Sequence, residues 1–225
     1  MLAVDLTTGV RTLLSDDAEI DSNFPNIRAG YVALDSANNR VLLVDFRRAE
    51  VGSVDLSTGI YSVLSNNSVP DAFNKFAAPS SIVLDNGRSR ALVADPSLRA
   101  VVAVDLGTGG RTNFSDDVTP DANNPLLGPS VITLDTASDR VLVVDAGTTV
   151  VAIDLSTGMR SIVSGPTQAG SSNQFVTLQS LVIDSDRNRA LFLDRLGSAM
   201  KAVDLANGAH SIVCRVCKEP KRSTL

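Results

Sequence analysis

The sequence predicts an all-β protein, a β-propeller built from four-stranded antiparallel blades. Two observations lead to this prediction. The 225-residue chain carries an internal repeat, and periods of about 20–50 residues are typical of solenoids, propellers and arrays. Each repeat consists of short runs rich in Val, Ile and Leu that are bounded by Asp, Asn, Ser and Gly, which is the pattern of β-strands separated by turns.

The repeat is defined by landmarks that keep a constant spacing along the chain. One element has the form [VI]DL followed by a glycine four residues after the aspartate. The aspartates of this element are Asp5, Asp55, Asp105, Asp154 and Asp204, and the glycines are Gly9, Gly59, Gly109, Gly158 and Gly208. A second element alternates with the first. Its landmarks are Asp35, Asp85, Asp135 and Asp184, then Arg40, Arg90, Arg140 and Arg189, then Asp45, Asp95, Asp145 and Asp194.

The third repeat shows the four strands that we expect in each unit. The predicted strands are 131–135, 140–145, 150–155 and 160–164, with TASD as the turn after the first and STG as the turn before the last. The glycine that recurs in the last turn, Gly158 in this unit, is expected at positive φ, because a glycine there has no Cβ to clash.

The distribution of apolar residues favours a propeller over a parallel β-helix. The first two strands are apolar at nearly every position, which predicts burial on both faces, whereas polar residues interrupt the fourth strand, as in RTLLS, YSVLS and RSIVS. A sheet that is apolar inside and polar outside suits a blade that packs between two neighbours around a channel. A parallel β-helix is the alternative, but its turns are shorter and its strands do not form antiparallel hairpins.

The run ITLDTASDRVLVVDAGTTVVAIDLSTGMRSIVS resembles the repeats of the six-bladed, TolB-like propellers. That superfamily includes the YWTD repeats of lipoprotein receptors, the NHL repeats, and the gluconolactonase-like and strictosidine-synthase-like proteins. The chain is also similar to uncharacterised bacterial propellers that carry loops such as SDDVTPDANNP. The resemblance covers the chain to about Cys214 and implies the fold. Gluconolactonase-like members hold a divalent metal with a Glu, an Asp and Asn residues, but none of Glu19, Glu50 and Glu219 lies on a predicted first strand.

The number of repeats predicts an incomplete ring within a single propeller domain at 1–214. Residues 1–15 supply only the third and fourth strands of a blade, and four full blades begin at Tyr31, Ser81, Val131 and Ser180. The basic tail 215–225 offers no further hairpin. Three outcomes are possible: a fragment of a six-bladed protein, which we favour; two chains that share a ring; or a strained five-unit ring. Unpaired blade edges also predict self-association.

The amino-acid composition limits the classes of molecule that we expect the protein to bind. The net charge is −5, with 22 Asp but only 3 Glu, and the 16 Arg are spread over repeat positions. Nucleic-acid binding needs clustered Lys and Arg, so we expect no nucleic-acid partner and instead an unknown protein or small molecule. No apolar run reaches the roughly 18–20 residues that span a bilayer. Met1 leads into the repeat without a secretory signal, and we expect an extracytoplasmic location only for a longer parent protein.

No catalytic residues are predicted. His210 is the only histidine and falls on a fourth strand, where we expect it at the rim. We therefore expect no Ser-His-Asp arrangement, and no GxSxG, Walker or GxGxxG motif lies in a suitable context. Cys214 and Cys217 form a lone CxxC without a second pair, which we interpret as incidental rather than as half of a zinc site.

The aspartates that end the second strand are the first candidate binding residues. Because they recur in every blade, the simpler interpretation is that aspartates at strand ends bond backbone N–H groups of the next turn and pair with the repeat arginine of their own blade. The functional interpretation is an acidic ring at one mouth of the channel that attracts a cation. The residues concerned are Asp45, Asp95, Asp145 and Asp194.

The long loops between blades are the second candidate, because binding residues often lie on loops between rigid strands. In SDDVTPDANNP, carboxylate and amide oxygens offer ligands for Ca²⁺, although ordinary turn chemistry explains the same residues. The possible metal ligands are Asp116, Asp117, Asp121 and Asn123. We therefore predict a non-catalytic propeller that acts as a scaffold or binding module without a firm cofactor, with a calcium-dependent lactonase or esterase as the alternative.

Overall fold

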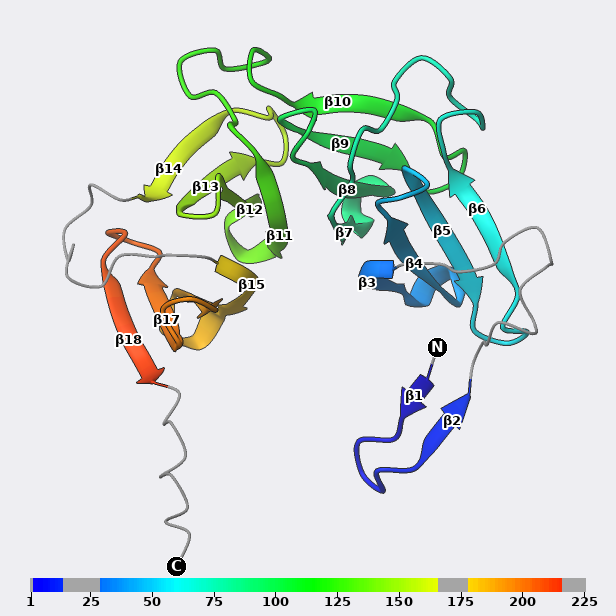
Figure 1. Ribbon diagram of the computed structural model, residues 1–225, viewed down its shortest axis with the longest axis horizontal. Coiled ribbons are helices and arrows are strands. Elements are labelled where there is room, and N and C mark those ends of the chain that lie inside the picture. The colour runs from blue at the N-terminus through cyan, green and yellow to red at the C-terminus, as the bar shows by residue number, and fades with distance from the viewer. Residues whose placement is uncertain (1, 14–28, 166–177, 216–225) are drawn as a thin grey trace, which may run out of the picture.

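The computed structural model describes residues 2–13, 29–165 and 178–215, and these form four blades and a hairpin. The blades stand side by side around an axis, and together they trace an open arc (Figure 1). Within each blade the strands follow one another as an antiparallel meander. The first strand of each blade lies near the axis and the fourth at the perimeter. The all-β propeller prediction is confirmed.

The strand bounds follow the repeat closely. Blade 1 contains β3 (Ala29–Asp35), β4 (Arg40–Asp45), β5 (Glu50–Asp55) and β6 (Tyr61–Ser65). Blade 2 contains β7 (Ser81–Asp85), β8 (Arg90–Asp95), β9 (Ala100–Asp105) and β10 (Arg111–Ser115). Blade 3 contains β11 (Pro129–Asp135), β12 (Arg140–Asp145), β13 (Thr149–Asp154) and β14 (Arg160–Ser164). Blade 4 contains β15 (Leu178–Asp184), β16 (Arg189–Asp194), β17 (Ala199–Asp204) and β18 (His210–Arg215).

Three of the innermost strands begin two residues earlier than predicted. β3, β11 and β15 start at Ala29, Pro129 and Leu178 rather than at Tyr31, Val131 and Ser180. Pairing with the end of the second strand extends them, because Pro129 and Leu178 lie opposite Asp145 and Asp194 across a register shift. The half blade is the hairpin of β1 (Leu2–Val4) and β2 (Arg11–Leu13). The rest of the predicted tail, from 216 on, lies outside the described residues.

The repeated turns have the local chemistry that the sequence predicts. In blade 2 the Asp105 carboxylate accepts hydrogen bonds from the backbone N–H groups of Gly107 and Thr108, at 3.0 and 2.7 Å. Gly109 follows at φ +71°, and the matching glycines of the other units also have positive φ. The first and second strands are joined by single 3-10 turns, η1 (Ser36–Asn38), η2 (Asn86–Arg88), η3 (Thr136–Ser138) and η5 (Ser185–Arg187), each ending at a left-handed residue.

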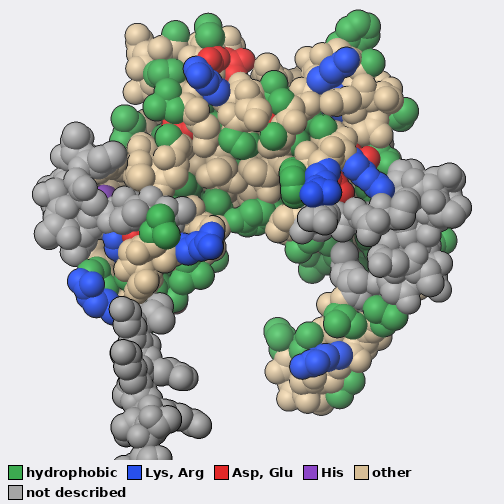
Figure 2. All heavy atoms as spheres, viewed as in Figure 1, with side chains coloured by type: hydrophobic (Ala, Val, Ile, Leu, Met, Phe, Trp, Pro, Cys, Tyr) green, Lys and Arg blue, Asp and Glu red, His purple; other side chains and the backbone are tan. Residues whose placement is uncertain are grey.

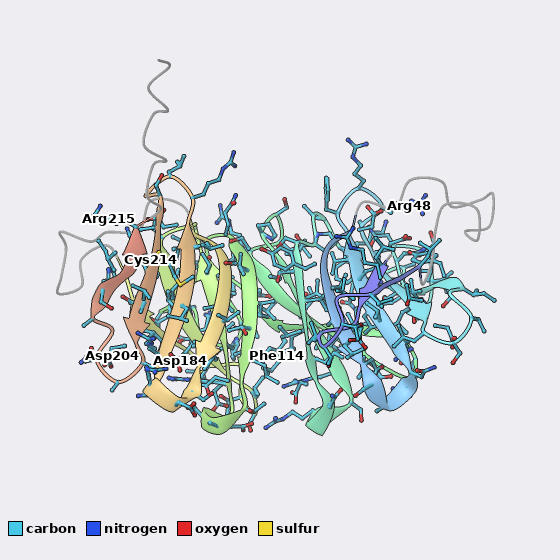
Figure 3. The ribbon with its side chains drawn as sticks, turned by 90° about the horizontal axis from the view of Figure 1, so that it is seen from below. Arg48, Phe114, Asp184, Asp204, Cys214 and Arg215 are labelled. Carbon is cyan, nitrogen blue, oxygen red and sulfur yellow. The ribbon has the colours of Figure 1, made fainter. Side chains whose placement is uncertain are left out.

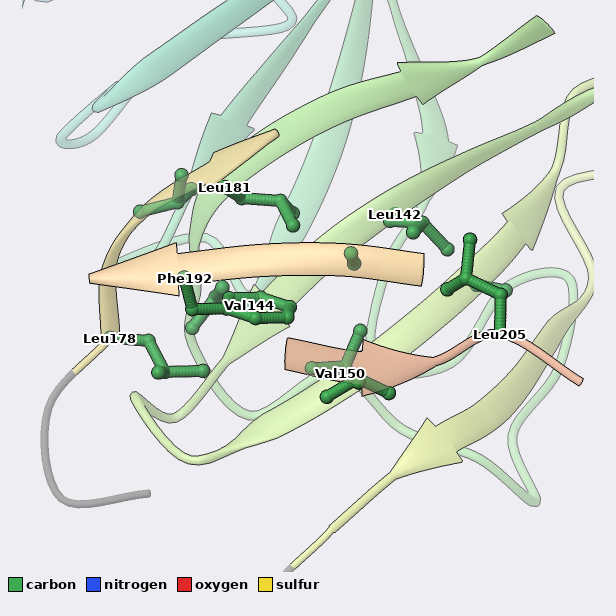
Figure 4. Close-up of a cluster of buried hydrophobic side chains, with 11 residues drawn as sticks. Leu142, Val144, Val150, Leu178, Leu181, Phe192 and Leu205 are labelled. Carbon is green, nitrogen blue, oxygen red and sulfur yellow. The ribbon is translucent and has the colours of Figure 1, made fainter. Parts of the chain in front are cut away.

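The hydrophobic core is divided among the seams between blades. One cluster joins blades 1 and 2, a second joins blades 2 and 3, and a third joins blades 3 and 4. In the third cluster Phe192 and Leu181 of blade 4 pack against Leu142, Val144 and Val150 of blade 3 (Figure 4). Each fully buried Val or Leu side chain contributes about 1.5–3 kcal/mol through burial. The seams therefore hold the arc together.

The two ends of the arc leave apolar side chains exposed that are buried elsewhere. Val32 and Leu34 of β3 are exposed, whereas their counterparts Ile82 and Leu84 pack into the seam between blades 1 and 2. At the other end, Val182 and Leu193 of blade 4 are exposed. A small cluster of Leu43, Val54 and Tyr61 covers part of the free side of blade 1. The number of blades in a closed ring stays a prediction.

Candidate functional site

The two ends of the strands define two faces of the arc. The first strand of each blade begins, and the second strand ends, on one face, which we call the mouth face. The opposite face, the turn face, carries the 3-10 turns and the glycine turns. Arg48 lies at the mouth face, and Asp184 and Asp204 lie at the turn face (Figure 3). The four predicted aspartates Asp45, Asp95, Asp145 and Asp194 all end their strands on the mouth face.

These four aspartates are buried and accept hydrogen bonds within the protein. Asp95 accepts hydrogen bonds from the backbone N–H groups of Ala77 and Ala78, and Asp145 accepts them from Leu127 and Gly128, at 2.7–3.1 Å. The bonded residues immediately precede the innermost strands. These two carboxylates therefore fix where the innermost strands enter the channel mouth, while cation binding by the four aspartates stays a prediction.

The other two aspartates of this set order their own loops. The Asp45 carboxylate accepts hydrogen bonds from the backbone N–H groups of Arg47 and Arg48. Asp194 accepts a hydrogen bond from Gly197 and also pairs with the Lys201 ammonium at 2.7 Å, in a buried contact found at this position of blade 4. The repeat aspartates on the turn face pair instead with the repeat arginines, at 2.8 Å in each blade, as the sequence predicts.

The predicted calcium ligands lie in the loop between blades 2 and 3, and their contacts are with the protein. Asp116 accepts hydrogen bonds from Val118 and Thr119, and Asp121 accepts them from the backbone of Asn123 and the side chain of Asn124. Asp117 lies 3.7 Å from Arg99. No group of three or more His, Cys, Asp and Glu side chains in the described ranges is placed to hold a metal ion. Calcium binding stays an untested prediction.

A guanidinium group occupies the centre of this loop. Arg160, which begins β14 of the next blade, is buried and donates to the carbonyl oxygens of Asn124, Asp121 and Thr119 and to the Ser115 hydroxyl. Arg111 makes the equivalent contacts with Asn74, Asp71 and Ser65 in the seam between blades 1 and 2, and its fourth acceptor is the Asn66 carbonyl oxygen. Burial lowers the pKa of both arginines, yet guanidinium groups remain protonated in proteins. We call this arrangement the arginine clamp.

The turn glycines let neighbouring blades approach at the clamp. A Cβ added to Gly158 would lie 2.6 Å from the Phe114 carbonyl oxygen of blade 2, and one added to Gly109 would overlap the Leu64 carbonyl oxygen of blade 1. Both glycines also adopt positive φ. Glycine is therefore required at these positions for two reasons: the turn needs positive φ, and the close contact between blades leaves no room for a Cβ.

The repeat changes at both ends of the arc. The clamp position holds Tyr61 in blade 1 and His210 in blade 4. The Tyr61 hydroxyl donates to the buried Glu50 carboxylate at 2.6 Å, and burial followed by this hydrogen bond raises the pKa of Tyr61 far above its usual value. Gly52 makes room for the Tyr61 ring, which a Cβ would overlap. The His210 ring bonds the Ser164 hydroxyl and is buried rather than at the rim as predicted.

The channel mouth contains a cavity where all four blades meet. Its volume is about 430 Å³. It is lined by the same repeat position in every blade, Gly30, Ser80, Ser130 and Gln179, together with Tyr31, Val131 and Leu178. The Tyr31 hydroxyl donates to the Gln179 carbonyl oxygen at 2.5 Å, so that this contact joins blade 1 to blade 4. Burial raises the pKa of Tyr31.

The lining of this cavity breaks the symmetry of the repeat. The Ser80 hydroxyl lies 2.8 Å from the Ser130 carbonyl oxygen, and the Ser130 hydroxyl lies 3.2 Å from that of Val144. The Gln179 side-chain amide makes no hydrogen bond to the described part of the chain. The sequence contains a signal for this site, because the residue at this repeat position changes from Gly to Ser, Ser and Gln along the chain. Only the arrangement of the blades around the axis shows that these residues meet.

Comparisons with known proteins support the fold. No protein-family profile matches the chain, and no curated protein sequence matches it. Many solved structures match. One is the structure of a nidogen–laminin complex, with a TM-score of 0.70 and 17% identity over 93% of this chain and 69% of the matched chain. Another is a protein of unknown function from Bacteroides thetaiotaomicron, with a TM-score of 0.65 and 14% identity over 95% of this chain and 52% of the other.

At this level of identity the similarity establishes the propeller fold and carries no function with it. The chain spans about half of the Bacteroides protein that it matches. Within the described residues, no helix has the length and apolar character needed to cross a membrane.

Proposed function

We propose that this protein is a non-catalytic β-propeller that binds a partner at the mouth face. The observation that carries the proposal is the cavity at the channel mouth, where one repeat position brings together Gly30, Ser80, Ser130 and Gln179 from four blades. If this position served only to build the blades, the same residue would suffice in every blade. A ligand without rotational symmetry instead requires different residues around the axis. Loops and cavities at the end of a rigid scaffold are the usual place for binding residues.

Two further observations support binding rather than catalysis. The carboxylates at the strand ends of the mouth face accept hydrogen bonds from the protein itself, so they act on the architecture. A solved structure of similar fold comes from a complex between nidogen and laminin, which supports protein binding as one use of the fold. No contact in the described ranges favours the metal-dependent hydrolase, and that alternative, like the extracytoplasmic location, stays untested.

Self-association through the ends of the arc remains part of this proposal. The exposed residues Val32 and Leu34 at one end, and Val182 and Leu193 at the other, support it, because exposed apolar sheet faces with free edges favour association.

A fragment screen observed by NMR tests the location of the binding site. We expect small polar compounds to shift the amide signals of Gly30, Tyr31, Ser80 and Ser130. The variant Gln179→Trp fills the cavity and should abolish these shifts, while Thr112→Trp on the exposed side of β10 adds the same bulk elsewhere and should leave them. Shifts that cluster at the clamps, or that survive in Gln179→Trp, would place binding elsewhere.

A further inference from the structure

The four loops of the mouth face differ in charge from the protein as a whole. These loops join the second strand of each blade to the third, at 46–49, 96–99, 146–148 and 195–198, and they contain Arg47, Arg48, Arg99 and Arg195 but no acidic residue. The strand-end aspartates beside these loops are buried, and two further acids, the buried Glu50 and the partly exposed Asp117, lie near Arg48 and Arg99. Exposed charge on these loops is therefore positive, although the chain has a net charge of −5.

Two of these arginines are available to a partner. The guanidinium groups of Arg47 and Arg195 make no hydrogen bond or ion pair within the described ranges. Arg48 and Arg99 lie near Glu50 and Asp117, each at 3.7 Å. Figure 2 looks onto this face, where blue Lys and Arg side chains stand out and red acidic ones show only in small patches.

An exposed apolar side chain stands beside each available arginine. Phe46 precedes Arg47 and is 49% exposed, and Leu196 follows Arg195 and is 67% exposed. The first pair belongs to blade 1 and the second to blade 4. Each pair directly follows the end of a second strand, β4 or β16, and that strand end lies opposite the start of an innermost strand, β3 or β15. The Tyr31–Gln179 hydrogen bond joins β3 to β15 at the cavity. The pairs thus flank the channel mouth from two sides.

The turn face carries exposed acids as well as arginines. Its turns carry the exposed aspartates Asp105, Asp139 and Asp154, and hydrogen bonds from Thr108, Arg88 and Thr157 hold the pKa values of these carboxyls below their usual range. They are charged at neutral pH. Asp139 is paired with Arg88, and Arg187 is exposed on the same face, so the charge of the turn face is mixed.

We infer that the mouth face binds an acidic protein segment with apolar side chains between its carboxylates. This inference rests on the proposed function and names the partner of the same face. Arginine forms bidentate contacts with carboxylates, and arginine and aromatic residues are enriched among the residues that dominate protein interfaces. Phe46 and Leu196 provide apolar contacts for the segment, while Arg47 and Arg195 bind its carboxylate groups.

The test uses a fluorescein-labelled peptide of alternating Glu and Leu residues, with fluorescence anisotropy as the readout on the full chain. Three competitors are a peptide with Lys in place of Glu, a Glu–Ser peptide without apolar residues, and a single-stranded DNA oligonucleotide of equal charge. We expect the Glu–Leu peptide to bind more tightly than all three. An oligonucleotide that binds more tightly would overturn the inference in favour of a nucleic-acid face.

Matched charge reversals locate the binding surface. The double variant Arg47→Glu/Arg195→Glu should weaken peptide binding by roughly 30-fold or more, and Phe46→Ala/Leu196→Ala by roughly tenfold. Arg187→Glu on the turn face reverses one charge and is the control for Arg47→Glu and Arg195→Glu taken singly; it should have less than about a twofold effect, as expected of a rim or distant charge. Equal losses in mouth-face and turn-face variants would show nonspecific attraction and sink the inference.

The cavity variant separates this inference from the proposal beneath it. If Gln179→Trp abolishes the fragment-induced shifts but no acidic peptide binds the wild-type chain, then the binding site stands and the acidic partner is wrong. If the peptide binds in an arginine-dependent manner while no fragment enters the cavity, the face binds its partner through the loops alone.

Discussion

Arg160 and His210 occupy the same position of the repeat, six residues after the turn aspartate, and each begins the outer strand of its blade. Between blades 2 and 3, Arg160 binds three loop carbonyls and Ser115. Between blades 3 and 4, His210 contacts Ser164, whereas the buried Lys201–Asp194 pair lies within blade 4. The apolar clusters of the two seams are alike in size and composition.

Different residues therefore pack the blades and anchor the loops in this protein. Apolar side chains pack the blades in both seams, so the repeat tolerates a change at the clamp position. The loops that precede the arginine clamps share the pattern PDAxN, at 70–74 and 120–124, whereas the loop before His210 lacks its acids. In the sequence, arginine at the clamp position therefore occurs together with a preceding PDAxN loop.

Removing the clamp arginine should have the largest effect on stability. Arg160→Met keeps the aliphatic stem but leaves buried carbonyls and Ser115 without their donor, and we expect a loss on the order of 4 kcal/mol in the free energy of unfolding. His210→Met removes fewer contacts and should cost about 2 kcal/mol. Urea unfolding measures both.

Arg99→Met on an exposed loop is the control for loss of charge and should stay within about 0.5 kcal/mol of the wild type. Arg160→Lys should not rescue stability, because a single ammonium cannot reach the set of acceptors that a planar fork reaches. Equal costs for Arg160→Met and His210→Met would refute the distinction between the two seams.

Closing the contact between blades should have the next largest effect. Gly158→Ala places a Cβ against the Phe114 carbonyl oxygen in a left-handed turn, and we expect a loss of about 3 kcal/mol from strain and overlap together. Gly147→Ala is matched in backbone conformation, with φ +75° and open space around it, so it should cost only about 1–2 kcal/mol. Thermal unfolding of the two variants separates conformational strain from crowding in the seam.

If Gly147→Ala were as costly as Gly158→Ala, the close approach of blades 2 and 3 at this glycine would contribute nothing. Gly109→Ala tests the equivalent contact in the seam between blades 1 and 2, where a Cβ would overlap the Leu64 carbonyl oxygen.

Acid should weaken the Asp–Arg ion pairs that every blade carries on the turn face. Burial alone would raise the pKa of Asp35, but hydrogen bonds from Arg40 and Asn38 outweigh it, so the pKa in the folded protein is lowered. Its stabilising contribution is complete above the unfolded value of about 3.9 and is lost as the pH falls through the folded value. The urea midpoint should therefore be flat between about pH 7 and 5 and fall below about pH 4.

Asp35→Asn removes the titrating group and should reduce this dependence on acid, while Ser36→Ala in the same turn should leave it unchanged. Because Arg40 also donates to the Leu106 carbonyl oxygen of blade 2 at 2.8 Å, the variant tests whether the ion pair within a blade supports the contact between blades. A midpoint that falls equally in the wild type and in Asp35→Asn would contradict this role.

The local architecture of this protein follows from its sequence. Turn aspartates, glycines at positive φ and apolar strands are short-range features, so the repeat alone predicts four-stranded blades, and the structure confirms them. The pairs between Asp35 and Arg40 and their counterparts are also local, since they lie five residues apart. The shifted starts of β3, β11 and β15 were missed because they depend on pairing with the end of a second strand rather than on apolar pattern.

Contacts between blades were decided by the tertiary structure. The sequence offered the oxygens of SDDVTPDANNP as calcium ligands, and nothing local reveals that Arg160, 36–41 residues away, places its guanidinium among the carbonyls of that loop. Likewise, Gly30, Ser80, Ser130 and Gln179 are far apart in the chain and meet only because each blade begins at the axis. Strand formation depends on neighbours in sequence, whereas a site at an axis depends on the rotation that relates one blade to the next.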